Sequence, residues 1–314
     1  MIKNPQISFI IPAKDEENSI RPLYDQILSE MKKLRKSYEI LFIDDGSKDT
    51  TFDEIKKLSK INKNIRVIKH RSNFGKSIAL QNGFDLSQGK IVITMDADLQ
   101  DDPKEIPNFI KKIDEGYDLV SGWKKKRNDP ISKVIPSRVI NFVIRILTGV
   151  KIHDINCGFK AYKKEVVKGL NLYGDLYRFI PILADKKGYK ITEIIINHRN
   201  RLHGKSKYGW KRFISGFLDL LTIFFLARYL KRPGHFFGFI GISFLTIGST
   251  IGLYITYLRL TTGGINYRYP LLFLGVLSII LGVQFIMTGL LAEMIIFFQK
   301  KGDSNDLIKE TINL

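Results

Sequence analysis

Short apolar runs rich in β-branched residues alternate with polar stretches over the first two thirds of the chain. The polar stretches carry apolar residues at helical spacing, so each unit predicts one strand followed by one helix. The expected strands are residues 7–11, 40–43, 65–68, 91–95 and 119–120. This repeat predicts a mostly parallel, Rossmann-like α/β sheet with helices on both faces and right-handed connections.

Two longer apolar stretches near the C-terminal end differ from these runs. Residues 233–258 and 269–292 contain no Asp, Glu, Lys or Arg over 26 and 24 residues. At about 1.5 Å per helical residue, each stretch is longer than the hydrocarbon core of a bilayer, which is about 30 Å thick. They predict a hairpin of two transmembrane helices, over about 233–258 and 269–296. Buried core helices of a soluble domain are the alternative.

Basic residues flank the two predicted spans. Lys211, Arg212, Arg228, Lys231 and Arg232 precede the first span, Lys300 and Lys301 follow the second, and the connection holds Arg259 and Arg268. The positive-inside rule then places both ends of the chain in the cytoplasm. The apolar run at residues 7–11 is too short for a signal peptide and leads directly into charged residues. We therefore expect an integral protein of the cell inner membrane or its equivalent.

These patterns divide the chain into four parts. Residues 1–209 are expected to form a cytosolic α/β domain, and residues 210–232 an amphipathic helix beside the membrane. Residues 233–298 hold the two spans, and residues 299–314 form a cytosolic tail. Within the first part, residues at about 131–148 predict a second amphipathic helix. Both amphipathic helices combine an apolar stripe with basic residues, which suits the membrane interface.

Composition and charge exclude several classes of protein. With 44% hydrophobic residues in 314, the chain can bury a core, which excludes a disordered or collagen-like protein. The net charge of +19 attracts phosphate groups on a small substrate, a membrane or a nucleic acid. We expect no nucleic-acid partner, because the basic residues gather near the predicted membrane-facing segments. The single cysteine, Cys157, excludes an internal disulfide.

Acidic motifs follow three of the predicted strands. They are Pro12-Ala13-Lys14-Asp15-Glu16, Asp44-Asp45-Gly46-Ser47 and Asp96-Ala97-Asp98-Leu99-Gln100. Parallel strands end at one edge of a sheet, so these side chains are expected to converge there. Asp96, Asp98 and Gln100 carry oxygen ligands of the kind that suit Mg²⁺ or Mn²⁺. Each motif also has a purely structural interpretation, as a helix cap, as an ordinary turn or as first-turn helix acids.

Five motifs in this order resemble family 2 glycosyltransferases of the GT-A fold. They are Ile-Pro-Ala-Lys-Asp-Glu-Glu-Asn from residue 11, Asp-Asp-Gly-Ser from 44, Arg-Ser-Asn-Phe-Gly-Lys from 71, Asp-Ala-Asp-Leu-Gln-Asp-Asp-Pro from 96 and Arg-Leu-His-Gly-Lys-Ser-Lys-Tyr from 201. More closely, the chain resembles the polyprenyl-phosphate glycosyltransferases, which include dolichol-phosphate mannose synthases and bacterial undecaprenyl-phosphate glucosyltransferases. The two-span hairpin is similar to the bacterial branch.

The resemblance implies a nucleotide-sugar site at the sheet edge. Its donor contacts would be Pro12, Lys14, Glu16, Asp44, Asp45, Lys76, Asp96, Ala97, Lys124, Arg201 and Lys207. Asp96, Asp98 and Gln100 would hold the Mg²⁺ or Mn²⁺ that bridges the donor diphosphate. Lys124 stands where relatives often have arginine, so it would offer a point charge instead of a bidentate fork.

The resemblance also implies an acceptor site. The lipid phosphate would be contacted by Lys133, Ser137, Arg138 and Arg201. The alternative is that the basic helix carrying the first three residues only touches anionic headgroups of the membrane. A phosphate monoester has a second pKa of about 6, so it is already anionic and needs no strong base. Positioning should then dominate catalysis. Asp98, Asp154 and Arg201 are the expected catalytic residues, with a structural role for Asp154 as the alternative.

The implied activity is inverting transfer of a sugar from a nucleotide-sugar, such as UDP-glucose, to undecaprenyl or dolichyl phosphate at the cytoplasmic leaflet. A GDP-mannose donor is one alternative, and a non-catalytic membrane scaffold is another. A processive polysaccharide synthase is disfavoured, because the chain lacks the Gln-x-x-Arg-Trp motif. A homo-oligomer could form through Gly238, Gly241, Gly248 and Gly252, since small residues allow helices to approach closely.

Overall fold

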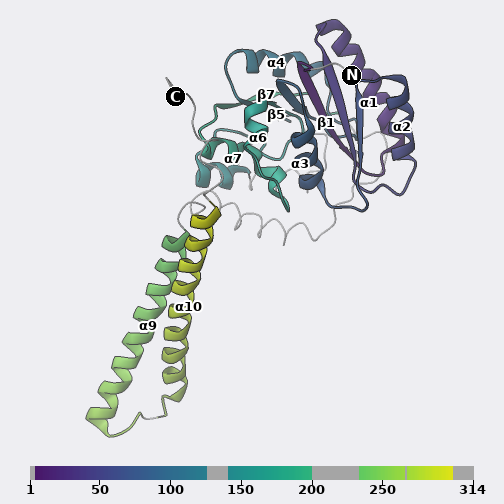
Figure 1. Cartoon of the computed structure of the whole chain (residues 1–314). Helices are drawn as coiled ribbons and strands as arrows, with labels where there is room; N and C mark the ends of the chain where they lie inside the picture. Colours follow the sequence, from purple (N-terminus) through teal and green to yellow (C-terminus); the bar gives the residue numbers. More distant parts are fainter. Residues whose placement is uncertain (1–3, 126–140, 200–232, 266, 300–314) are drawn as a thin grey trace. The chain divides into compact units, whose positions relative to one another are not determined.

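The computed structural model describes residues 4–125, 141–199, 233–265 and 267–299 (Figure 1). The chain forms two compact units, Met1–Ile223 and Phe224–Leu314, which we call the α/β unit and the hairpin unit. The boundary between them falls inside the predicted helix at 210–232, which lies outside the described residues.

A sheet of seven strands forms the centre of the α/β unit, in the order β3-β2-β1-β4-β6-β5-β7. The strands are β1 (Ile7–Ala13), β2 (Tyr38–Asp44), β3 (Ile65–Lys69), β4 (Ile91–Thr94), β5 (Leu119–Trp123), β6 (Lys160–Lys163) and β7 (Ile191–Ile195). Strands β1 to β4 are mutually parallel, and β7 is parallel to β5. Strand β6 runs antiparallel between β4 and β5. The expected fold class, a mostly parallel α/β sheet, is confirmed.

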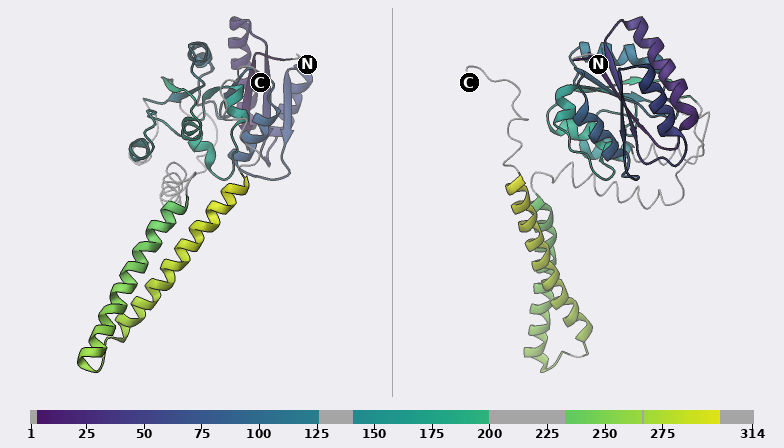
Figure 2. Two further views of the ribbon diagram at one scale, coloured as in Figure 1. Left: turned by 60° about the vertical axis from the view of Figure 1, so that its left-hand side comes forward. Right: turned by 45° about the vertical axis from the view of Figure 1, so that its right-hand side comes forward.

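Helices cover both faces of this sheet, as Figure 2 shows in two further views. The helices are α1 (Glu17–Leu34), α2 (Thr51–Ile61), α3 (Lys76–Leu86), α4 (Ile106–Asp114), α6 (Lys164–Lys168) and α7 (Ile180–Lys186), with short 3₁₀ helices η1 (Pro103–Glu105) and η2 (Leu176–Phe179). Apolar side chains of α1, α2 and α4 share one buried cluster with alternate residues of β1 and β2. Helix α3 packs on the other face, where a Cβ at Gly83 would lie 2.3 Å from the Ile10 side chain.

The hairpin unit consists of α9 (Pro233–Thr262) and α10 (Tyr269–Gln299), which run side by side (Figure 2). Both helices are long and apolar enough to cross a membrane. They extend slightly beyond the predicted spans. At the start of α9, the backbone N–H of Gly234 donates to Glu293 Oε1 at 3.2 Å. This bond satisfies one of the free amide groups of the first turn and gives the only acidic residue of α10 a partner.

Glycines on the two helices face each other at intervals of seven residues. A Cβ at Gly241 would lie 2.7 Å from the carbonyl oxygen of Gly282, and a Cβ at Gly248 would lie 2.7 Å from that of Gly275. Two of the glycines expected to support a homo-oligomer therefore pack inside the hairpin. By contrast, a Cβ at Gly238 would meet nothing within 4 Å. The homo-oligomer stays a prediction.

This difference predicts that Gly241→Ala will destabilise the hairpin, whereas Gly238→Ala on the same helix will not. The added methyl group at residue 241 meets a backbone carbonyl that cannot move aside, which typically costs about 1–3 kcal/mol. At residue 238 alanine only improves helix propensity. Thermal unfolding of the purified full chain in detergent measures both effects. Equal melting temperatures for the two variants would contradict the close packing.

Candidate functional site

The carboxyl ends of β1, β2 and β4 bring the three acidic motifs to one edge of the sheet. The first two are joined directly, since the Asp45 N–H donates to the Ala13 carbonyl at 2.9 Å. The Asp15 N–H donates to Ser47 Oγ at 3.0 Å. The Met95 N–H, just before the third motif, donates to the Ile10 carbonyl at 3.2 Å. Pro12, Lys14 and Glu16 are half-buried in the loop after β1.

The two aspartates at the end of β2 differ in the hydrogen bonds that their carboxylates accept. Asp45 accepts from the N–H groups of Phe74 and Gly75, at 2.8 and 2.9 Å, and its Oδ1 lies 2.8 Å from His70 Nδ1. Its carboxylate therefore fixes the loop that leads into α3. Asp44 is fully buried, and its Oδ1 accepts from the Ser47 N–H at 3.1 Å. Its Oδ2 has no hydrogen-bond donor among the residues that the structure describes.

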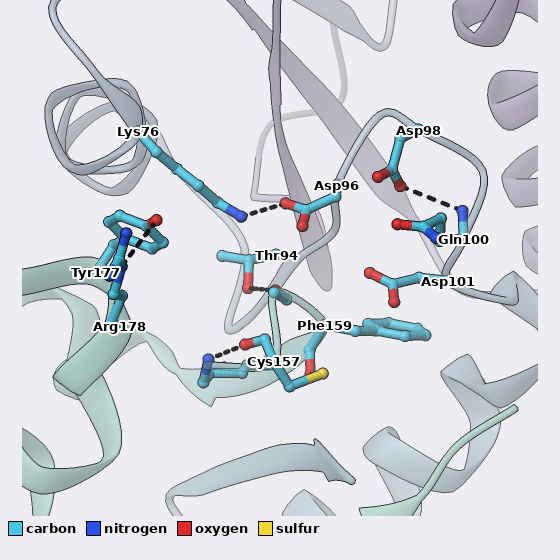
Figure 3. Close-up of polar contacts among 12 residues, drawn as sticks. Lys76, Thr94, Asp96, Asp98, Gln100, Asp101, Cys157, Phe159, Tyr177 and Arg178 are labelled. Carbon is cyan, nitrogen blue, oxygen red and sulfur yellow. Dashed lines mark hydrogen bonds and ion pairs between the residues drawn. The ribbon is translucent and has the colours of Figure 1, made fainter. Parts of the chain in front are cut away.

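The loop that Asp45 fixes leads directly to Lys76, which lies beside Asp96. Lys76 is the first residue of α3, and its ammonium group forms an ion pair with Asp96 Oδ1 (Figure 3). The two side chains keep 26% and 33% of their surface exposed, so a ligand can reach them. Burial alone would lower the pKa of Lys76, but the Asp96 carboxylate raises it above the ordinary value. Conversely, Lys76 holds the pKa of Asp96 down against the effect of burial.

The loop after β4 gathers the predicted metal ligands. Figure 3 shows the side chains of Asp98 and Gln100 on the same side of this loop, facing the region of Asp96. The loop turns tightly, because Leu99 has a φ of 62° and the Gln100 N–H donates to Asp98 Oδ1 at 3.2 Å. Ala97 is buried between the two aspartates.

This donor set fits a divalent metal that shares its coordination with a substrate. Within the described ranges, no group of three or more His, Cys, Asp and Glu side chains forms a closed metal site. Two carboxylates and one amide oxygen are instead an open, oxygen-only set. Mg²⁺ usually binds through one or two carboxylates and completes its shell with water and substrate phosphates. The residues present therefore suit such an ion.

Two further residues at this edge were not expected from the sequence. Asp101 is 1% exposed and forms an ion pair with Lys124 at 3.0 Å. Burial opposes the charge of Lys124, but Asp101 raises its pKa above the ordinary value. Arg199 anchors the chain beside the same loop. Its backbone N–H donates to the Gln100 carbonyl at 3.0 Å, and its guanidinium nitrogen lies 2.5 Å from Asp102 Oδ1. Asp101 lies in the motif that begins at residue 96 but was given no ligand role there, and Arg199 belongs to none of the five motifs.

The segment that leads into β6 lies under the site. Asp154 and Lys160 are each 2% exposed. Burial lowers the pKa of the Lys160 ammonium to about 8, and the nearby Lys76 adds to this effect. Burial also raises the pKa of the Cys157 thiol to about 12, so this cysteine is a packing residue and no nucleophile. Lys160 could not be predicted from sequence patterning, because a lysine at a strand end usually faces solvent.

Five predicted site residues lie outside the described residues. They are the acceptor-side residues Lys133, Ser137 and Arg138, and the loop residues Arg201 and Lys207. Of the predicted helix at 131–148, residues 141–148 are described and helical. Of the described candidates, five gather around one charged centre: Lys76, Asp96, Asp98, Gln100 and Lys124. Pro12, Lys14 and Glu16 are half-buried on the neighbouring loop, and the remaining four, Asp44, Asp45, Ala97 and Asp154, are buried.

Comparison with known proteins identifies the family of the chain. The family model described as glycosyl transferase family 2 matches residues 8–170. A dodecaprenyl-phosphate galacturonate synthase from Rhizobium johnstonii is 34% identical over 98% of this chain and 94% of its own. An undecaprenyl-phosphate 4-deoxy-4-formamido-L-arabinose transferase from Shewanella sediminis is 35% identical over 92% of this chain and 86% of its own.

Solved structures show the same fold at lower sequence identity. Glucosyl-3-phosphoglycerate synthase from Mycobacterium tuberculosis, in complex with Mn²⁺ and UDP-glucose, has a TM-score of 0.52 at 20% identity, covering 70% of this chain and 78% of its own. A mannosyltransferase from Pyrobaculum calidifontis, in complex with GDP-mannose and Mn²⁺, has a TM-score of 0.51 at 19% identity, covering 71% and 63%. The α/β unit thus has the GT-A fold, and the chain belongs to glycosyl transferase family 2.

Proposed function

We propose that this protein transfers a sugar from a nucleotide-sugar to a polyprenyl phosphate, with inversion at the anomeric carbon. One observation carries the proposal: the similarity to a dodecaprenyl-phosphate galacturonate synthase extends over 98% of the chain, hairpin unit included. The charged centre around Asp96 supports it, because it places carboxylates and lysines where a metal-bound diphosphate would be held. A non-catalytic scaffold would not need these residues together.

The donor would bind along the carboxyl edge of the sheet. Asp96, Asp98 and Gln100 would hold Mg²⁺ or Mn²⁺, and such an ion, when bound, neutralises the charge of the leaving diphosphate. Lys76 lies beside these ligands and would exchange its ion pair with Asp96 for a donor phosphate. Asp44 would accept a hydrogen bond from the base only if its Oδ2 becomes accessible, because this oxygen is fully buried and has no donor among the described residues. We assign Asp45 to holding the loop before α3, because its oxygens are already occupied.

Pro12, Lys14 and Glu16 would complete the nucleoside side of the donor site, with Ala97 lining it. The Mn²⁺ and nucleotide-sugar complexes of the two solved relatives support a metal-bound donor. Lys124 would contribute positive charge from its ion pair with Asp101. Arg201 and Lys207 follow the anchor at Arg199 by a few residues, and we assign them to the donor phosphates.

The acceptor would approach from the membrane. On the described part of the helix at 131–148, Phe142 and Ile146 are 54% and 66% exposed. Exposed apolar side chains next to a basic residue, Arg145, support a helix that lies in the membrane interface. Lys133, Ser137 and Arg138 on the same predicted helix, together with Arg201, would bind the lipid phosphate there. The hairpin unit would span the membrane with both ends of the chain in the cytoplasm.

The chemical step follows from this arrangement. An oxygen of the lipid phosphate attacks the anomeric carbon, while the bond from that carbon to the nucleoside diphosphate breaks on the opposite face. No residue has to remove a proton from the nucleophile, since the phosphate is already ionised. The chain therefore acts by orientation and charge. Asp154 is 2% exposed, which favours a positioning role over direct contact with the substrates.

The proposal predicts label transfer from one sugar donor to undecaprenyl phosphate in detergent. The panel contains UDP-glucose, UDP-galacturonate, UDP-4-formamido-arabinose and GDP-mannose, with Mn²⁺ or EDTA. We expect a lipid-linked product that EDTA abolishes and that Asp98→Ala reduces by about 100-fold or more, because a ligand of the metal that would stabilise the leaving diphosphate is lost. Asp25→Ala, at an exposed position on α1, is the control. Absence of product from every donor, with dolichyl phosphate also tested, would contradict the proposal.

The acceptor site makes a separate prediction. Arg138→Ala should raise the KM for the lipid phosphate by about tenfold, the effect of losing one charge-assisted hydrogen bond. The KM for the nucleotide-sugar should not change. Arg145→Ala, on the same predicted helix, is the matched control and should leave both constants as they are. Equal effects of the two substitutions would mean that the helix attracts anionic lipid only through its overall charge.

A further inference from the structure

Gly158 lies directly against the Asp96 carboxylate. A Cβ at this position would be 2.6 Å from Asp96 Oδ2 and 2.8 Å from its Cγ. Such distances leave no room for a side chain at residue 158, so the Asp96 carboxylate packs directly against the backbone of Gly158. The backbone of Gly158 does not lie in the left-handed region. The close approach, and not the backbone conformation, therefore requires glycine.

Two buried side chains bond to the backbone of Cys157 and Gly158 and fix its position. Thr94, two residues before Asp96 on β4, donates its hydroxyl to the Gly158 carbonyl at 2.8 Å. Lys160, the first residue of β6, donates from its ammonium group to the Cys157 carbonyl. Thr94 and Lys160 are also paired in register across β4 and β6. Figure 3 shows Thr94 and Cys157 beneath Asp96.

These two bonds also have an electrostatic effect. A free backbone carbonyl beside a carboxylate would repel it, since both carry negative charge on oxygen. Here the carbonyls of Cys157 and Gly158 are each engaged by a donor, and one donor is the positively charged Lys160. The backbone of these two residues can therefore lie close to Asp96 with less electrostatic repulsion of its carboxylate. Gly158 lies against Oδ2 of Asp96, whereas Oδ1 pairs with Lys76. The exposed part of the carboxylate is accessible to ligands.

We infer that Gly158 is a positioning residue for Asp96, and that Thr94 and Lys160 act through it by fixing the backbone at residues 157 and 158. The inference rests on the proposed function, because it gives Asp96 its role as a metal ligand. It gives a role to the Asn-Cys-Gly-Phe-Lys segment at residues 156–160, which contributes no residue to the proposed donor and acceptor sites. Ligands whose supporting contacts are lost typically bind metal about 10–100-fold less tightly.

The test measures Mn²⁺ binding without turnover. The full chain is purified in detergent with UDP present, and free Mn²⁺ is followed by electron paramagnetic resonance. Gly158→Ala and Thr94→Val should each weaken Mn²⁺ binding about tenfold or more. Thr94→Ser keeps the hydroxyl and should restore tight binding. Gly169→Ala is the matched glycine control, because its Cβ would meet nothing closer than 3.4 Å and it lies at the end of α6.

Thermal unfolding without metal separates positioning from folding. The inference requires that Thr94→Val lose Mn²⁺ affinity at a temperature well below its own metal-free melting temperature, where the variant is still folded. If Gly158→Ala fails to fold, Thr94→Val and Thr94→Ser still decide the question. Mn²⁺ binding by Gly158→Ala and Thr94→Val equal to that of the wild type would overturn the inference and leave the proposed function intact. Absence of Mn²⁺ binding by the wild type would instead remove the proposed metal role, and the inference with it.

Discussion

The Asp96 carboxylate, charged and two-thirds removed from water, is the constraint on which the rest of the site depends. A carboxylate in this position stays ionised only if positive charge compensates for the lost hydration. Lys76 provides that charge, and Lys124 and Lys160 add to it from the neighbouring strands. The same positive field suits a donor diphosphate. One arrangement thus stabilises the ionised carboxylate and would also favour the donor that we propose.

The sheet topology makes this arrangement possible. The parallel strands β1, β2 and β4 end at one edge, so Asp44 and Asp96 reach the same side of the sheet from distant parts of the sequence. The antiparallel strand β6 inserts beside β4 and brings the backbone of Gly158 against Asp96. A purely parallel order would place the start of β6 at the opposite edge. The mixed sheet therefore has a direct consequence for the site.

The sequence was sufficient for features that follow from apolar patterning. Strands β1 to β5 and both long apolar helices were predicted because each contains a run rich in apolar residues. Strands β6 and β7 were missed, since β6 begins and ends with lysine and the short β7 is interrupted by Thr192 and Glu193. Motif spacing located the charged edge, but it could not show that Asp45 bonds to backbone amides while Asp44 Oδ2 has no donor in the described part of the chain. Such differences depend on side-chain direction, which two adjacent identical residues do not reveal.

The central claim is that Asp96 and Asp98 hold a divalent metal against the donor diphosphate. Anomalous diffraction at the manganese absorption edge, from crystals of the full chain grown with UDP and Mn²⁺, tests it most directly. The account predicts one strong peak at coordination distance from both carboxylates and from the diphosphate, with Asp96 still against Gly158. A diphosphate bound away from Lys76, or a manganese peak that neither aspartate contacts, would contradict it.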